Sequence, residues 1–193
     1  MTDYFALLDL PRRPWLDEEE VKRQFHSFSR TLHPDAQNNR IPVAVETPSF
    51  HDLNEAYGVL RDPRQRLRHF LALVEGPTVG AMAGELQDLF ASICEVMHAA
   101  DRLLERHAAT QGVLARSLLK AETVKIESAI GSTLKQLNEL YQQALSEVQK
   151  ADARSTSDNP PDLTALAQIN LNLTFLVRWL TQLEEKKFLL SNV

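Results

Sequence analysis

The sequence has few cysteines and few glycines. Its 193 residues include one cysteine, Cys94, and six glycines. A single cysteine excludes a disulfide within the chain and any metal site built from several cysteines, and it fits a reducing compartment. Runs of β-branched residues are also scarce. Together these shortages favour an all-α fold.

Signals for membranes and export are absent as well. No stretch approaches about eighteen uninterrupted apolar residues, so no transmembrane helix is expected. The chain opens with Met-Thr-Asp-Tyr-Phe, which contains neither a basic segment nor the apolar segment that would follow it in a signal peptide. We therefore expect a cytoplasmic location.

Neither the charge nor the motifs point to a nucleic-acid binder or an enzyme. The net charge of −5 at pH 7 argues against nucleic-acid binding by the chain as a whole. There is no glycine-rich phosphate loop, no His-Glu-x-x-His motif and no convincing catalytic triad. Cys94 and His98 are four residues apart, but two ligands do not make a structural zinc site, and we interpret Cys94 as a small apolar core residue. We expect no catalysis, no cofactor and no bound metal.

Residues 1–75 have the pattern of short helices separated by prolines. The apolar residues of 4–10 predict one short helix that ends before Pro11. Asp17, followed three residues later by Glu20, is a capping-box pattern that begins a second helix. Its apolar residues recur at the spacing of one helical face, and they are Val21, Phe25, Phe28 and Leu32. The basic residues Lys22, Arg23, His26 and Arg30 fall off this face and should face solvent.

Prolines also mark the boundaries of the next helices. Pro34 should end the second helix because it lacks an N–H and disfavours the α conformation at the residue before it. After a polar loop, Thr47 and Pro48 predict an N-cap and a first-turn proline. The helix that follows has the apolar residues Phe50, Leu53, Tyr57 and Leu60. Asp62 and Pro63 again combine an N-cap residue with a first-turn proline, and they begin a short basic helix with Arg64, Arg66 and Arg68.

Long helical periodicity begins after Gly76 and Pro77. The pattern predicts three helices, over about 82–107, 111–151 and 163–189. Such helices with short connections form an antiparallel bundle. The core positions expected from the pattern include Leu86, Leu89, Phe90, Ile93, Met97, Ala100 and Leu104, then Leu114, Leu118, Ile126, Ile130, Leu134, Leu137, Tyr141, Leu145 and Val148, and finally Phe175, Leu176, Trp179, Leu180 and Leu183.

The amino-terminal motifs, taken in order, resemble a J domain, the module through which J-proteins activate DnaK-type ATPase chaperones. The matching segments are Asp3-Tyr4-Phe5, the basic helix ending in Leu32-His33-Pro34-Asp35, Leu53-Asn54-Glu55-Ala56-Tyr57 and Asp62-Pro63-Arg64. The opening segment, the segment 66–71 and the direct continuation into helices are similar to the HscB type, the J-type co-chaperones of iron–sulfur cluster assembly. The resemblance implies a J domain over 1–75, an antiparallel helical hairpin with short flanking helices, followed by a three-helix bundle over 82–193.

The resemblance also implies a chaperone-binding site. Its residues would be His33, Pro34, Asp35, Lys22, Arg23, His26 and Arg30. The basic side chains would steer and orient the encounter with an acidic surface of the chaperone, while the His-Pro-Asp triplet would promote ATP hydrolysis allosterically. Two positions depart from the usual J-domain pattern, Ala36 in place of a lysine and Ser27 where a basic residue is common, and both bear on the strength of coupling.

The client implied by the resemblance is an iron–sulfur scaffold protein of the IscU type, held on the first bundle helix. The matching client-binding positions are Leu89, Phe90, Ile93 and Met97. One apolar stripe cannot serve both the core and a partner, and Phe90 and Met97 lie one step off the line of the other two. Two alternatives remain open at this point: a J-protein with a different client, and a helical adaptor that stimulates no chaperone.

Overall fold

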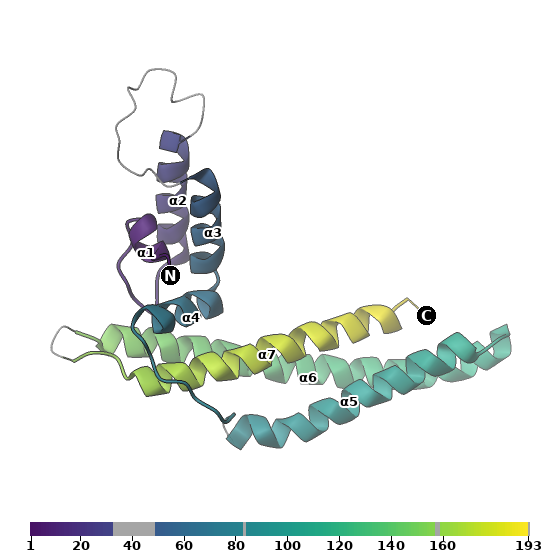
Figure 1. The fold of residues 1–193 in the computed structure, drawn as a ribbon. Helices are drawn as coiled ribbons and strands as arrows, with labels where there is room; N and C mark the ends of the chain where they lie inside the picture. The colour runs from purple at the N-terminus through teal and green to yellow at the C-terminus, as the bar shows by residue number, and fades with distance from the viewer. Residues whose placement is uncertain (33–48, 83, 157–158, 193) are drawn as a thin grey trace. The chain divides into compact units, whose positions relative to one another are not determined.

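The computed structural model describes residues 1–32, 49–82, 84–156 and 159–192, and in these residues all regular secondary structure is helical (Figure 1). The helices are α1 (Tyr4–Leu7), α2 (Glu18–Leu32), α3 (Phe50–Arg61), α4 (Pro63–Leu73), α5 (Gly84–Ala109), α6 (Val113–Arg154) and α7 (Leu163–Leu190). This confirms the all-α prediction. Within the described ranges, no helix combines the length and the apolar character needed to cross a membrane.

The internal contacts divide the chain into two units. The first contains residues 1–79 and 147–170, and the second contains residues 80–146 and 171–193. The division therefore passes through α6 and α7, each of which contributes to both units. The domain limits expected from the sequence, 1–75 and 82–193, stay a prediction.

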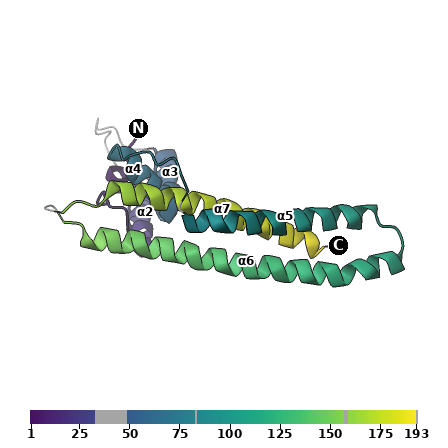
Figure 2. The same ribbon diagram turned by 90° about the horizontal axis from the view of Figure 1, so that it is seen from below.

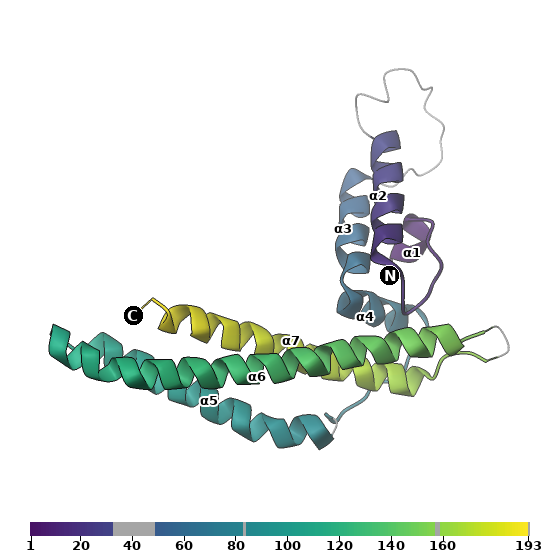
Figure 3. The same ribbon diagram turned by 180° about the vertical axis from the view of Figure 1, so that it is seen from behind.

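The first unit is organised around the hairpin of α2 and α3, which lie side by side (Figures 1 and 3). α3 packs against α2 and also contacts the short helices α1 and α4. The ring of Phe25 stacks on that of Tyr57 with 4.3 Å between their centroids, which joins the two long helices. The buried apolar residues of this unit are Phe5, Leu8, Leu10, Leu16, Val21, Leu53, Ala56, Leu60, Leu67, Phe70 and Leu71, with Val148, Leu166 and Ala167 from α6 and α7. This is the predicted hairpin with short flanking helices.

Polar side chains cap the helices of this unit. Asp62 caps α4 by accepting the N–H groups of Arg64 and Gln65, with Pro63 in the first turn, as predicted. The backbone N–H of Glu20 donates to Asp17, which fits the predicted start of α2.

The predicted start of α3 at Thr47 and Pro48 is wrong. Ser49 is the N-cap, and it forms a reciprocal capping box with Asp52. A Ser with an acid three residues later satisfies two free N–H groups at once. Phe50 was expected in the core but is half-exposed. Side chains lean toward the helix N-terminus, so that of the first residue extends beyond the packed part of α3.

In the second unit α5, α6 and α7 run along one another (Figure 2). The helix limits agree with the predicted ones to within a few residues. The buried core is made of Leu86, Ile93, Ala100, Leu103, Leu119, Ile126, Ile130, Leu137, Leu176, Trp179, Leu183 and Leu190, with Phe175 and Leu180 packed against it. The predicted core residues of the last helix are thus confirmed.

The prediction of a core position is wrong for two residues of α6. Leu114 is 78% exposed and Leu118 is 74% exposed. The buried face of α6 passes instead through Leu119, Ile126 and Ile130. Each residue turns the helix by about 100°. The side chain of Leu118 therefore points about 100° away from that of Leu119, which lies on the buried face.

Candidate functional site

The predicted chaperone-binding site lies partly outside the described residues. His33, Pro34 and Asp35 fall in the range 33–48, as does Ala36, and the structure does not describe this range. The part of the site that is described is the surface of α2.

The basic residues of α2 share one exposed face. Lys22, His26 and Arg30 follow one another at every fourth position, Arg23 lies beside them, and all four are exposed. Residues at this spacing are neighbours on a helix surface. The first turn of α2 carries three glutamates, where negative charge suits the helix dipole. The helix is therefore acidic at its start and basic along the rest of this face.

Two of the four basic residues form ion pairs within the helix. Nζ of Lys22 lies 3.6 Å from Oε1 of Glu19, and the guanidinium of Arg23 pairs with Glu20. Exposed pairs of this kind contribute only about 0.3–0.5 kcal/mol. Carboxylates of a partner could replace these glutamates at little cost.

A row of ring contacts connects this basic face to α3. The ring of His26 lies 5.6 Å from that of Phe25, which stacks on Tyr57. The guanidinium of Arg61 lies 5.7 Å from the centroid of the Tyr57 ring. Arg61 is exposed and adds a cation beside α2 that the sequence interpretation missed. The signal was its position four residues after Tyr57, where a cation reaches the ring of the preceding turn.

His69 holds α1 against α4. Nε2 of His69 accepts the backbone N–H of Tyr4 at 3.1 Å, and its ring stacks on the Tyr4 ring at 4.6 Å. Accepting this hydrogen bond requires the neutral imidazole. Burial lowers the pKa of His69, which favours that form. A hydrogen bond to Glu55 raises the pKa of Tyr4.

Arg66 differs from the other arginines of α4 because it is only 2% exposed. Its Nη1 donates to the carbonyl of Leu60 at 2.9 Å and its Nε to that of Pro14 at 3.4 Å. Its guanidinium lies 5.5 Å from the centroid of the Trp15 ring. Arg66 therefore joins α4, the end of α3 and the segment before α2, and it presents no charge to a partner.

The four predicted client-binding residues differ in accessibility. Phe90 is 49% exposed, whereas Ile93 is 1% exposed and belongs to the core; Leu89 and Met97 are half-buried. The Phe90 ring lies 6.0 Å from that of Trp179, and Phe175 lies 5.8 Å from Trp179. These three aromatic residues, which we call the aromatic cluster, bring α5 and α7 together. The sequence interpretation placed Phe175 in the core alone, although its spacing of four residues from Trp179 indicates a shared face.

Metal ligands do not gather in the parts of the chain that the structure describes. No three His, Cys, Asp or Glu residues there are placed to hold a metal ion. Cys94 is half-buried in the bundle and forms no disulfide.

Comparisons with known proteins agree with this geometry. Residues 3–69 match the family model of the DnaJ domain. The chain is 44% identical over 64 residues to chaperone protein DnaJ 2 of Thermus thermophilus, covering 33% of this chain and 21% of that protein. It is 34% identical over 84 residues to chaperone protein DnaJ of Caldicellulosiruptor saccharolyticus, covering 42% and 20%. The chain thus spans about a fifth of the length of these relatives.

The hairpin, its basic face and this match identify residues 3–69 as a J domain. A J domain is a regulatory module without catalysis of its own, in agreement with the expectation that the chain is not an enzyme. The fold of the whole chain is similar to that of the chaperone HscB from Vibrio cholerae, with a TM-score of 0.56 at 19% identity. That similarity covers 95% of this chain and 96% of HscB, and it confirms the predicted HscB-type arrangement of the fold.

Proposed function

We propose that this protein is a co-chaperone that stimulates the ATPase of a DnaK-type chaperone. The observation that supports this most is the exposed basic face of α2 within a region that matches the DnaJ domain. In this proposal Lys22, Arg23, His26 and Arg30 meet an acidic surface of the chaperone. Charge complementarity of this kind speeds the encounter and fixes its orientation. His33, Pro34 and Asp35 then act on the chaperone allosterically.

Charge reversal on α2 tests the docking step. Lys22→Glu and Arg30→Glu should each raise the concentration needed for half-maximal ATPase stimulation by about tenfold. The matched control is Lys150→Glu, which makes the same change of charge at an exposed position of α6. Because the attraction is electrostatic, added salt should weaken stimulation by the unchanged protein. Equal stimulation by all three variants would contradict the proposed docking face.

The second part of the proposal is that the bundle delivers a client, an iron–sulfur cluster scaffold protein of the IscU type. It is supported by the similarity of the fold to HscB and by the aromatic cluster of α5 and α7, in which Phe90 is exposed. Phe90 supplies the exposed apolar ring, with Leu89 and Met97 beside it. Ile93 supports them from the core. Hydrolysis in the chaperone would trap the client, and a cytoplasmic location belongs to the same proposal.

Single-turnover ATPase assays of the chaperone, with and without the scaffold protein, test this part. We expect the two additions together to stimulate more than the sum of each alone. Phe90→Ser should remove the synergy and leave the stimulation by the J domain unchanged. Phe188→Ser, at an exposed position near the end of α7, is the matched control. Stimulation without synergy would favour a different client, and no stimulation of any DnaK-type chaperone would favour a helical adaptor.

A further inference from the structure

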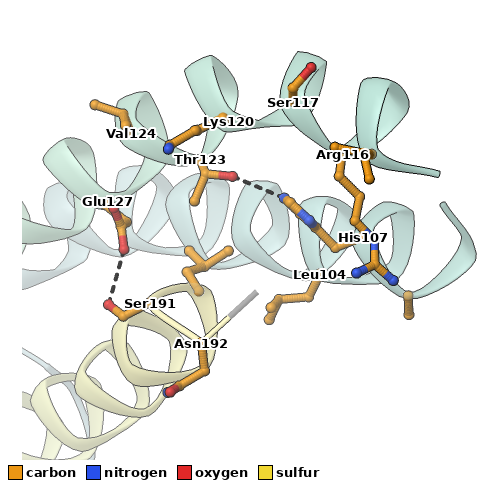
Figure 4. A pocket seen from close by; sticks show the side chains of 13 residues that line it. Leu104, His107, Arg116, Ser117, Lys120, Thr123, Val124, Glu127, Ser191 and Asn192 are labelled. Carbon is orange, nitrogen blue, oxygen red and sulfur yellow. Dashed lines mark hydrogen bonds between the residues drawn. The ribbon is translucent and has the colours of Figure 1, made fainter. Parts of the chain in front are cut away.

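A cavity of about 840 Å³ lies in the second unit, where the end of α5, the start of α6 and the end of α7 meet (Figure 4). The apolar part of its lining includes Leu104 of α5, Val113 of α6 and Leu190 of α7. Two hydrogen bonds hold the walls together, between Nε2 of His107 and Oγ1 of Thr123 at 3.0 Å and from Ser191 to Glu127 at 3.0 Å. The cavity shares no residue with the aromatic cluster.

The charge on the α6 side of this cavity is positive. Arg116 and Lys120 line it, both are exposed, and neither forms an ion pair with another described residue. Nε of Arg116 reaches only the carbonyl of Thr110, at 3.5 Å. Glu127 is the one carboxylate among the described lining residues. In a chain of net charge −5, this is a local basic site.

The first turns of α6 are apolar on more than one side. Leu119 and Ile126 face the core. In contrast, Val113 is 89% exposed to solvent, and Leu114 and Leu118 are also largely exposed. Helices that are apolar around most of their surface are normally buried. Exposed apolar side chains that cluster in this way mark an interaction site.

We propose that this end of the bundle binds an acidic amphipathic segment of a partner protein. Its large apolar side chains would fill the cavity against Leu104, Val113 and Leu190, and its carboxylates would pair with Arg116 and Lys120.

Peptide display on the full chain tests the proposal. Random peptides of roughly 16 residues, enough for about four helical turns, are displayed on phage and selected against the unchanged protein. We expect the enriched peptides to combine Asp or Glu with large apolar residues. Their affinity for the double variant Arg116→Glu and Lys120→Glu should fall by about tenfold or more. Lys135→Glu, exposed on the same helix outside the cavity, should bind as the unchanged protein does.

Several results would overturn the proposal. These are enrichment of basic or uncharged peptides, no enrichment at all, or acidic peptides that bind the double variant equally well. Sedimentation that shows a dimer abolished by Leu114→Gln and Leu118→Gln would assign the surface to a second copy instead. All substituted positions are exposed, and circular dichroism checks that each variant is folded. Stimulation of a DnaK-type chaperone should not change in the double variant, so failure here is separable from failure of the proposed function.

Discussion

The guanidinium of Arg13 forms a bidentate ion pair with the carboxylate of Asp152. Nε donates to Oδ1 at 3.1 Å and Nη2 donates to Oδ2 at 2.6 Å. Asp152 is buried, whereas Arg13 is half-exposed. The pair joins the segment between α1 and α2 to the last turn of α6, across 139 residues of sequence.

Removing Arg13 should therefore destabilise the protein. Arg13→Ala leaves the buried carboxylate of Asp152 without its donors, and we expect a loss of about 2 kcal/mol in the free energy of unfolding. Arg12→Ala is the control, because Arg12 pairs with Asp3 at an exposed site and should cost less than about 1 kcal/mol. Urea unfolding followed by circular dichroism measures both. Equal losses would show that the burial of Asp152 does not matter.

Arg66 and Arg68 should respond differently to the same substitution. Arg66→Met removes donors from two buried carbonyls and the contact with Trp15, so we expect a loss of about 2–3 kcal/mol. Arg68→Met, at an exposed position two residues later, should change stability by less than about 0.5 kcal/mol. Thermal or urea unfolding of the two variants distinguishes them, and a stable Arg66→Met protein would contradict the structural role given to Arg66.

The stability of the first unit should depend on pH through His69. Its pKa is lowered in the folded state because the imidazole is buried, so the unfolded chain binds the proton more readily. This contribution to stability is fully present above the unfolded pKa of about 6.5 and is lost as the pH falls through the lower folded pKa. His69→Gln, which retains a side-chain acceptor, should flatten the decline between neutral and mildly acidic pH. Urea midpoints measured across that range, with His98→Gln as an exposed control, test this. An unchanged pH profile in His69→Gln would refute it.

The helices could be predicted because their signals are local. Asp17 and Asp62 cap helices where the sequence places them, and the spacing of Leu176, Trp179 and Leu183 identifies a buried face. The residues that were wrongly predicted to be buried fit the helical pattern, but burial also depends on which other segments of the chain pack against them. Leu118 fits a helical period but has no described neighbour to cover it.

The candidate site was predictable in part for the same reason. The basic face of α2 follows from helical spacing alone, and the structure places its four residues together. Arg61 joins it only because Tyr57 stacks on Phe25 across two helices. Likewise, Arg66 has the same charge as Arg68, and only the carbonyls around it separate a buried role from an exposed one. Contacts between segments that are distant in the sequence cannot be predicted from local helical periodicity.

The most direct test of the proposed function is the single-turnover ATPase rate of a DnaK-type chaperone with this protein and with its His33→Gln variant. The proposed function predicts that the unchanged protein raises the rate and that the variant does not, while circular dichroism and unfolding show the two proteins to be equally folded. Equal stimulation by a folded His33→Gln protein, or no stimulation by either protein, would contradict it.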